Sequence, residues 1–256
     1  MGPSPSYLPW RPESGDLSDS QPFRDVLSDT LSSGLLAHDA ADDHTDAALG
    51  LGTPTNHQTI IACMKKLYAF DFDGTLTTRD TLLVFIRYAC GTSSFALGFL
   101  RHAHLLVLMK LGLYPNWKAK QKIFSYFFRD MSLADFNALC QRFAADNRQL
   151  LRPQGLQAIA DAQAEGADVV IVSASIDNWV QPFCPQVTVL GTQIEVINGH
   201  LTGRFLTNNC YGQEKVNRLL ALYPDRSTYH LIAYGDSRGD QQLLAFADEA
   251  HYRPFK

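Results

Sequence analysis

The stretch FDFDGTLT, residues 70–77, ends an apolar run, KKLYAF at 65–70, that has the composition of a buried strand. It places Asp71 and Asp73 two positions apart. A strand would point both side chains to one face, because its side chains alternate with a period of two. Two carboxylates that close repel each other, and each resists ionisation. The stretch therefore indicates a site in which something offsets this repulsion.

Strands and helices alternate along the chain from residue 64 onward. Further strands are predicted at 168–175, 187–196, 200–206, 229–237 and 249–255. Helices are predicted at 154–166, 212–224 and 237–248, the first ended by a glycine and the second by a proline. Asn198 and Gly199 favour a tight turn between two of the strands. The alternation predicts an α/β fold with a Rossmann-like parallel sheet and helices on both faces.

Residues 77–152 interrupt this alternation and are predicted to be mostly helical, with breaks near Gly91, 112–115 and 131–132. We interpret them as a helical cap inserted into a catalytic core. That core is predicted to consist of 64–76 and 153–256.

Residues 1–63 differ in composition from the rest of the chain. They contain nine acidic and two basic residues, and they are rich in Ser, Asp, Pro, Gly and Thr. This composition predicts a disordered acidic extension, with one short helix at 23–38. Met64 would be a natural first residue of the folded part, so an upstream over-extension of the reading frame is an alternative explanation for 1–63.

The cap has the opposite charge. Residues 77–152 hold eleven Lys or Arg, four Asp and no Glu, which gives a net charge of +7. Such a surplus predicts an anionic partner, namely phosphate, nucleic acid or an acidic membrane surface. No aromatic and basic pattern of a nucleic-acid-binding motif is present, so we expect no nucleic-acid partner.

The apolar segment 94–114 is about long enough to span a membrane, which takes roughly 20 residues. Four basic or titratable residues interrupt it: Arg101, His102, His104 and Lys110. Charges at the bilayer centre are costly, which disfavours a span. The alternatives are a buried cap helix and an interfacial helix with its basic residues at the lipid headgroups.

Five cysteines are scattered along the chain without a CxxC pair: Cys63, Cys90, Cys140, Cys184 and Cys210. An odd, dispersed set is typical of reduced thiols and predicts a cytoplasmic protein. The N-terminus lacks the basic and apolar regions of a secretory signal.

Polar residues follow the predicted core strands at their carboxyl ends, where open α/β sheets bind their ligands. Asp71 and Asp73 follow the first strand, Ser173 follows the run DVVIV at 168–172, and Asp236 follows the run LIAYG at 231–235. Asp240 lies four residues after Asp236, and Lys215 lies at the start of the preceding helix. We therefore expect these side chains to meet at one edge of the sheet.

This set of groups suits phosphoryl transfer. Clustered carboxylates suit Mg²⁺, which would offset the repulsion between them. An aspartate can attack phosphorus and form an aspartyl-phosphate, and a second carboxyl can protonate the leaving oxygen and then activate water. Ser173 and Lys215 can hold the phosphoryl group. The turn that follows Asp73 offers backbone N–H groups to phosphate.

Each of these features has a simpler explanation when taken alone. The sequence DFDGT could form a turn or a calcium loop, although the remaining ligands of an EF-hand are missing. Asp236 could be only a helix cap, Ser173 only a strand-end hydroxyl and Lys215 only a solvated cation. Their joint occurrence, in this order and on these elements, favours a catalytic site.

The combination resembles the haloacid dehalogenase superfamily of phosphohydrolases over residues 64–256. Its four motifs appear here as DFDGTLT, VVIVSAS, the lysine of GQEKV, and YGDSRGD. The resemblance implies Asp71 as nucleophile and Asp73 as general acid and base. It implies a Mg²⁺ site made by the Asp71 carboxylate, the Asp73 carbonyl oxygen and Asp236, supported by Asp240. It also implies a phosphate site that includes four residues: Gly74, Ser173, Ala174 and Lys215.

The resemblance narrows the substrate to two alternatives. Asp80 lies nine positions after Asp71, where phosphoserine phosphatases carry a glutamate that contacts the substrate amine. Those enzymes usually have DxDST where this chain has DFDGT, and their cap motif is not recognisable here. The segments 82–112, 206–216 and 234–254 look more like the phosphatidylglycerophosphatase C type, which acts on a lipid phosphate at the inner membrane.

We therefore expect a Mg²⁺-dependent phosphomonoesterase. Its substrate is either a phospholipid or lipid-linked phosphate, with peripheral contact of the basic cap at the inner membrane, or a small soluble phosphate such as phosphoserine. A phosphotransferase of the same fold and a non-catalytic binding module are further alternatives. Because Asp73 serves both hydrolysis and transfer, the sequence does not separate these two reactions.

Overall fold

A computed structural model gives the structure of the protein and describes residues 64–256. The disordered extension predicted for 1–63, the helix predicted at 23–38 and Cys63 lie outside the described residues. Within the described part, four cysteines are free thiols: Cys90, Cys140, Cys184 and Cys210.

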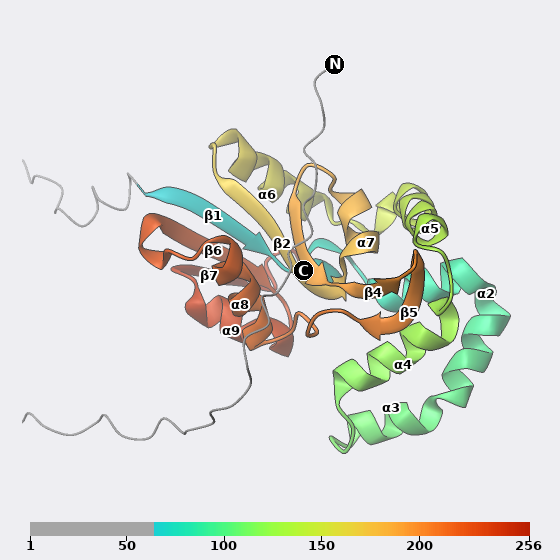
Figure 1. Ribbon diagram of the computed structural model, residues 1–256. Coiled ribbons are helices and arrows are strands. Elements are labelled where there is room, and N and C mark those ends of the chain that lie inside the picture. Colours follow the sequence, from blue (N-terminus) through green and yellow to red (C-terminus); the bar gives the residue numbers. More distant parts are fainter. Residues whose placement is uncertain (1–63) are drawn as a thin grey trace, which may run out of the picture. The chain divides into compact units, whose positions relative to one another are not determined.

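A five-stranded sheet forms the core, with the strand order β3-β2-β1-β6-β7 (Figure 1). Its strands are β1 (Lys65–Phe70), β2 (Asp168–Ile176), β3 (Thr188–Thr192), β6 (Tyr229–Gly235) and β7 (Glu249–Tyr252). All neighbouring strands of this sheet run parallel. The structure therefore confirms the predicted α/β fold with a parallel sheet.

The two faces of the sheet are buried under different helices. Alternate side chains of β1 point to opposite faces, so they belong to different clusters. Leu67 and Ala69 belong to a cluster that includes residues of α8 (Gln213–Leu222) and α9 (Gln241–Phe246). Tyr68 and Phe70 belong to the larger cluster, to which α6 (Pro153–Ala164) contributes. Because both faces are covered, the central strands β1, β2 and β6 carry nearly continuous apolar runs.

The predicted cap region contains four helices: α2 (Thr81–Arg101), α3 (Ala103–Lys110), α4 (Asn116–Phe128) and α5 (Leu133–Asp146). Five phenylalanines fill their interior without solvent exposure: Phe85, Phe124, Phe128, Phe136 and Phe143. The ring of Trp179, from the short helix α7 (Asp177–Val180), stacks on Phe85 with centroids 4.9 Å apart. The interior of these helices is therefore continuous with the core of the sheet.

A hairpin of β4 (Ile194–Ile197) and β5 (His200–Phe205) packs against α4. Asn198 and Gly199 both have positive φ, of 51° and 78°, which is the conformation that the predicted tight turn needs. At Gly203, a Cβ atom would lie 2.4 Å from Oγ of Ser125 in α4. Glycine at this position lets the hairpin approach the cap closely.

Several predicted elements differ from the structure. The helix predicted at 237–248 is α9 at Gln241–Phe246, preceded by a short turn, and the strand predicted at 249–255 ends at Tyr252. Residues 187–196 are not one strand, because the chain leaves the sheet after Thr192, whose buried hydroxyl donates to the Ala174 carbonyl. Likewise 94–114 is not one helix, because the backbone leaves the helical region at His102. Among the described helices, α2 alone is long and apolar enough to cross a membrane, and Gly91 breaks its helical geometry with a φ of 76°.

Candidate active site

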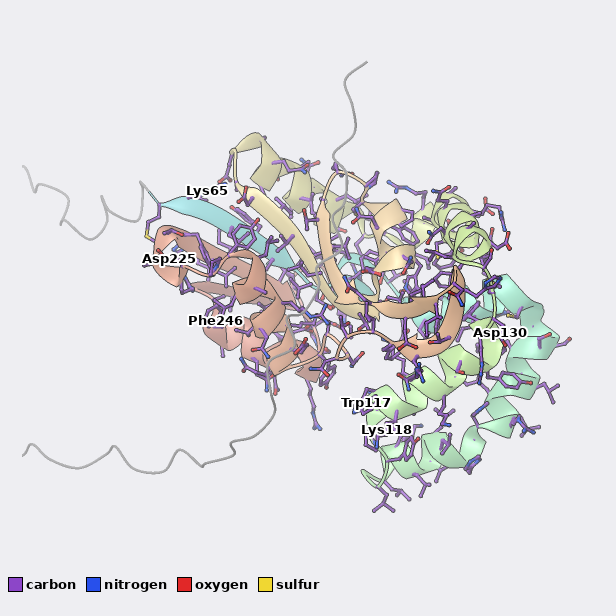
Figure 2. The ribbon with its side chains drawn as sticks, viewed as in Figure 1. Lys65, Trp117, Lys118, Asp130, Asp225 and Phe246 are labelled. Carbon is purple, nitrogen blue, oxygen red and sulfur yellow. The ribbon has the colours of Figure 1, made fainter. Side chains whose placement is uncertain are left out.

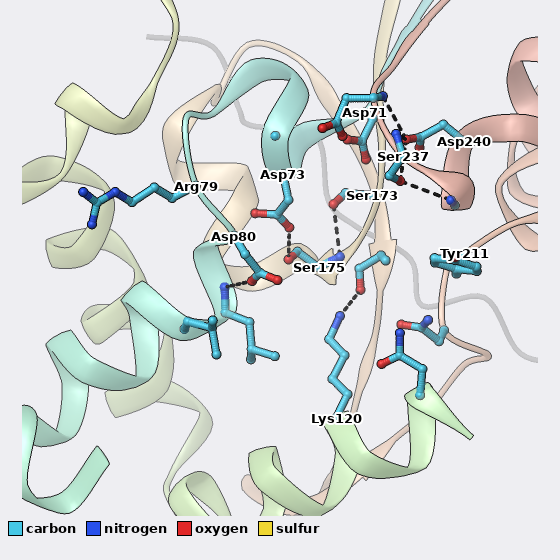
Figure 3. A pocket seen from close by; sticks show the side chains of 18 of the residues that line it. Asp71, Asp73, Arg79, Asp80, Lys120, Ser173, Ser175, Tyr211, Ser237 and Asp240 are labelled. Atoms are coloured by element: carbon cyan, nitrogen blue, oxygen red, sulfur yellow. Dashed lines mark hydrogen bonds between the residues drawn. The ribbon is translucent and has the colours of Figure 1, made fainter. Parts of the chain in front are cut away.

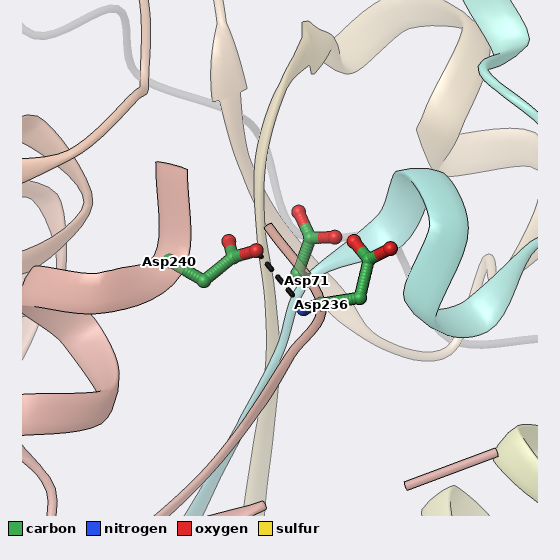
Figure 4. Close-up of side chains that lie close together, drawn as sticks. All are labelled: Asp71, Asp236 and Asp240. Carbon is green, nitrogen blue, oxygen red and sulfur yellow. Dashed lines mark hydrogen bonds between the residues drawn. The ribbon is translucent and has the colours of Figure 1, made fainter. Parts of the chain in front are cut away.

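Three carboxylates meet at the carboxyl edge of the sheet, where they were expected (Figure 4). Asp71 follows β1 and Asp236 follows β6, and these strands are parallel neighbours in which Phe70 pairs with Tyr234. Asp240 ends the short turn that follows β6. The three residues each offer a ligand atom within 4.8 Å of the others. The register of the two strands therefore places Asp71 beside Asp236, and the turn after β6 adds Asp240.

Lys215 is the counter-ion inside this cluster. It is buried in the first turn of α8, and its Nζ donates to Oδ1 of Asp71 and to Oδ1 of Asp240, each at 2.6 Å. Burial alone would lower the pKa of Lys215, but the two carboxylates outweigh burial and raise this pKa above its usual range. Lys215 is therefore cationic at neutral pH, which agrees with its predicted contact to phosphate.

Burial has the opposite effect on Asp71. It raises the pKa of this carboxyl to about 7, although Lys215 acts in the opposite direction. The charged form of Asp71 is thus poorly stabilised by Lys215 alone. An additional cation beside Asp71 would favour the ionised carboxylate that a nucleophile needs.

Asp240 anchors the loop that carries Asp236. Oδ2 of Asp240 accepts hydrogen bonds from the backbone N of Asp236 at 3.1 Å, and from the N and Oγ of Ser237 at 2.9 and 2.8 Å. Burial works to raise the pKa of Asp240, but Lys215 and the Ser237 donors outweigh it, so this pKa is lowered. These contacts suit the supporting role predicted for Asp240.

Asp73 lies apart from this cluster, although it is only two positions from Asp71 (Figure 3). The period of two does not apply here, because β1 ends at Phe70 and the chain then turns over Phe72–Leu76, where Asp73 and Gly74 have non-helical backbone angles. Oδ1 of Asp73 accepts from N and Oγ1 of Thr81 at 2.7 and 2.6 Å. Oγ of Ser175 donates to its Oδ2. The expected clash between the aspartates is therefore avoided by divergent side chains.

Gly74 forms the tight part of this turn, with φ of 84°. A Cβ atom at this position would lie 2.6 Å from Oδ2 of Asp236, so only glycine lets the loop approach that carboxylate. The backbone N–H of Gly74, predicted to bind phosphate, donates here to Oγ1 of Thr77 at 3.2 Å. Whether this N–H also contacts phosphate stays a prediction.

The acidic cluster fits a hard divalent cation. Carboxylate oxygens are the ligands that Mg²⁺ prefers, and it binds through one or two of them with water and phosphate in its other positions. The three carboxylates carry more negative charge than Lys215 balances. The side chain of Lys256 also donates to Oδ2 of Asp236, which shows that this oxygen is accessible to a cation. Mg²⁺ itself stays a prediction.

The end of β2 brings Ser173 and Ala174 into the same pocket. Oγ of Ser173 accepts from the backbone N of Ser175 at 3.0 Å. The carbonyl of Ala174 accepts from the side chains of Lys120 and Thr192. Ser175 was not among the site residues predicted from the sequence. It lies two positions after Ser173 in a strand, so both side chains face the same side, and this spacing could have identified it.

Asp80 also lines the pocket, and it caps α2 by accepting from the backbone N of Leu82 at 2.9 Å. Capping explains an aspartate at this position without any substrate contact. The predicted substrate contact of Asp80 stays a prediction.

The pocket has a volume of about 650 Å³ and reaches from the carboxylates to α2, α3 and α4 (Figure 3). Lys120 of α4 points into it, and its Nζ donates to the Ala174 carbonyl. Burial lowers the pKa of Lys120, partly offset by Asp73 and Asp80. No sequence pattern distinguishes Lys120, because α4 also carries Lys118 and Lys122 and only the fold shows which lysine faces inward.

Comparisons with known proteins agree with this geometry. Residues 68–245 match the family model of haloacid dehalogenase-like hydrolases. The chain is 36% identical over 200 residues to Protein CicA of Caulobacter vibrioides, covering 74% of this chain and 86% of that protein.

Solved structures show the same fold. A protein of unknown function from Bordetella pertussis Tohama I superposes with a TM-score of 0.64 at 21% identity, covering 71% of this chain and 86% of that one. A probable phosphoserine phosphatase from Vibrio cholerae superposes with a TM-score of 0.53 at 17% identity, covering 71% and 54%. With the family match, these findings confirm the expected superfamily: the chain belongs to the haloacid dehalogenase-like hydrolases and is an enzyme.

Proposed function

We propose that this hydrolase is a Mg²⁺-dependent phosphatase that cleaves phosphate monoesters through an aspartyl-phosphate on Asp71. The observation that carries the proposal is the meeting of Asp71 with Asp236, Asp240 and Lys215 at one edge of the sheet, while Asp73 is held separately. Nucleophile and proton donor thereby have separate environments, which their two tasks require.

In the first step a carboxylate oxygen of Asp71 forms a bond to phosphorus, and the bond from phosphorus to the leaving oxygen breaks. Lys215 holds Oδ1 of Asp71, so Oδ2 is the oxygen proposed to attack. Asp73, in its acid form, gives its proton to the leaving alcohol. Lys215 supplies positive charge and Ser173 a hydrogen-bond donor to the phosphoryl oxygens.

In the second step Asp73 takes a proton from water, and the water oxygen attacks phosphorus. The bond between phosphorus and Asp71 then breaks, which releases inorganic phosphate and restores the carboxylate. When bound, Mg²⁺ would supply positive charge to the phosphoryl oxygens and to the clustered carboxylates. Asp71, the carbonyl oxygen of Asp73 and Asp236 would hold it, and Asp240 would keep the Asp236 loop in place.

Activity toward p-nitrophenyl phosphate, measured with Mg²⁺ and with EDTA, tests this proposal. We expect activity with Mg²⁺ only, and none in the Asp71→Asn protein. Asp168→Asn is a matched control, because Asp168 lies at the opposite end of β2 in a surface ion pair with Lys65. Mg²⁺-dependent hydrolysis by Asp71→Asn would exclude Asp71 as the nucleophile.

For the substrate, we favour a phospholipid or lipid-linked phosphate. The wall of the pocket opposite the carboxylates is apolar, with contributions from Leu83, Phe99, Leu106, Met109 and Ile123. Such a wall matches an apolar leaving group. The ammonium of Lys120 lies between this wall and Ser173 and suits a second anionic group in the substrate.

The surface of the cap supports the same substrate class. Residues 81–129 contain seven Lys or Arg and no acidic residue. Large apolar side chains around α3 are exposed, among them Leu100 at 74%, Leu111 at 66% and Leu113 at 72%. Exposed apolar residues among cations match an anionic bilayer surface. We propose peripheral contact of this cap surface with the cytoplasmic face of the inner membrane.

Co-sedimentation with anionic and neutral vesicles tests this contact. Leu111→Ser with Leu113→Ser should reduce binding to anionic vesicles, whereas Leu222→Ser, at an exposed leucine of α8, should not. Absence of binding, together with hydrolysis of phosphoserine in preference to phosphatidylglycerophosphate, would favour the soluble substrate instead. Transfer of phosphate to an added alcohol would identify a phosphotransferase.

A further inference from the structure

A second cavity, of about 560 Å³, opens beside the active-site pocket. It lies between the start of α4 and the segment that joins β5 to α8. We call it the side pocket. Nine residues line it, all uncharged: Asn116, Trp117, Gln121, Phe205, Leu206, Thr207, Asn208, Asn209 and Tyr211. Nothing in the proposed phosphoryl transfer uses these residues.

The side pocket adjoins the active-site pocket. Asn116, Asn209 and Tyr211 line both cavities. Oγ1 of Thr192 lies 3.4 Å from Oδ1 of Asn209 and donates to the carbonyl of Ala174 at 2.8 Å. Ala174 directly follows the proposed phosphate-binding Ser173. The alcohol of a substrate bound at the carboxylates would therefore extend toward the side pocket.

The polar groups of the side pocket are mainly carboxamides. Those of Asn116 and Asn208 make no hydrogen bond to any residue in 64–256, while Oε1 of Gln121 accepts from the backbone N of Phe205. A carboxamide both donates and accepts, which suits a hydroxyl group that does the same. An anion or cation would find no opposite charge in this lining.

Two aromatic rings border the carboxamides. Trp117 is 44% exposed and Tyr211 is 45% exposed. Nζ of Lys118 lies 5.4 Å from the centre of the Trp117 ring, outside the lining residues (Figure 2). Tyr211 borders the active site from the other side, since a Cβ atom on Gly239 would lie 2.6 Å from its ring (Figure 3). Flat rings beside carboxamides suit a ligand with both C–H faces and hydroxyl edges.

We propose that the side pocket binds an uncharged, hydroxyl-rich part of the leaving alcohol, of the glycerol or sugar type. This inference rests on the proposed phosphatase function, because the side pocket would select the alcohol of a phosphate monoester. It specifies the headgroup, whereas the apolar wall and the cap surface concern the lipid chain. It also gives a role to the sequence NNCY at 208–211, which the phosphoryl-transfer set leaves unused.

Calorimetric titration of the full-length Asp71→Asn protein in Mg²⁺ provides the test, with glycerol 3-phosphate and propyl phosphate as probes. The two probes share a phosphate and a three-carbon chain and differ by two hydroxyl groups. We expect glycerol 3-phosphate to bind at least about tenfold more tightly, which one or two net hydrogen bonds supply. Asn208→Ala should remove most of this preference and leave binding of propyl phosphate unchanged.

Asn217→Ala is the matched control, because Asn217 is exposed on α8 outside both cavities and should keep the full preference. Equal binding of the two probes, or a preference that survives both Asn208→Ala and Trp117→Ala, would overturn the proposal. These results are separable from failure of the phosphatase proposal. If the phosphatase proposal fails, the wild-type protein hydrolyses neither probe. If only the side-pocket proposal fails, it hydrolyses both probes without preference.

Discussion

Lys215 and Asp71 are 144 positions apart in the sequence, and their Nζ and Oδ1 atoms lie 2.6 Å apart in the buried centre of the site. The same ammonium bonds Asp240, so one cation from α8 joins the ends of β1 and β6. A buried charge is tolerated only with a partner. This contact therefore combines a proposed catalytic role with a structural one.

Replacement of Lys215 by Met should abolish activity and also destabilise the protein. It leaves Asp71 and Asp240 buried without their counter-ion, and breaking a buried pair of this kind costs about 3–5 kcal/mol. Urea unfolding at pH 7.5 measures the change in the free energy of unfolding. Lys66→Met is the control, because the Lys66 pair with Glu165 is exposed and contributes less than about 1 kcal/mol. Equal losses of unfolding free energy in the two variants would contradict the proposed stabilisation by the buried pair.

Asp71→Asn should stabilise the metal-free protein at alkaline pH. Burial raises the pKa of Asp71 to about 7 in the folded state, whereas an unfolded Asp titrates near about 3.9. The folded protein thus binds the extra proton, and this contribution is complete below about pH 4 and is lost as the pH rises through about 7.

Thermal unfolding in EDTA at pH 5, 6, 7 and 8 tests this dependence. The melting temperature of Asp71→Asn relative to wild type should increase with pH, by at least about 2–4 °C at pH 8, which corresponds to about 1 kcal/mol for a chain of this size. Mg²⁺ should stabilise the wild type more than the variant. A difference that stays constant from pH 5 to pH 8 would show that Asp71 is not the titrating group.

Gly74→Ala should weaken metal binding. Its Cβ would approach Oδ2 of Asp236 to 2.6 Å, and its φ is 84°. Gly112→Ala separates the two effects, because Gly112 has a similar φ of 74° but no atom within 4 Å of the new methyl group. Both variants should lose about 1 kcal/mol of stability. Only Gly74→Ala should lower Mg²⁺ affinity in a calorimetric titration. Unchanged affinity would argue against a metal site that depends on the close approach of Gly74 to Asp236.

Ser175→Ala should lower kcat by about 10- to 100-fold with little change in KM. Ser175 donates to Oδ2 of Asp73 and holds this carboxyl in place for proton transfer. Loss of one hydrogen bond to a charged group costs about 1.5–3 kcal/mol. Ser227→Ala, at an exposed serine that bonds Asp225, should leave both constants unchanged. A larger effect on KM than on kcat would indicate that Ser175 contacts the substrate instead.

Much of this fold could be predicted from local sequence. The apolar run of β1, the β-branched run of β2 and the Asn-Gly turn of the hairpin are each set by residues close in sequence. The parallel order then places Asp71, Ser173 and Asp236 at one edge, because carboxyl ends of parallel strands coincide. These local patterns were sufficient to locate the acidic cluster.

Other features of the site could not be predicted, because they depend on tertiary contacts. The sequence could not show that Lys120, among three lysines of α4, faces the pocket, because that depends on how α4 packs against β5 and α2. The divergence of Asp71 and Asp73 required the turn at Phe72–Leu76, which the strand pattern concealed. The side pocket joins residues 116–121 with 205–211, which no local pattern connects.

The most direct test of the central claim is the chemical state of Asp71 during turnover. The wild-type protein would be quenched with acid while it hydrolyses p-nitrophenyl phosphate in Mg²⁺, reduced with borohydride, and digested for mass spectrometry. An aspartyl-phosphate on Asp71 is reduced to homoserine, so we predict homoserine at position 71 and at no other aspartate. Intact Asp71 in samples quenched during active turnover, or homoserine at another position, would contradict the proposed mechanism.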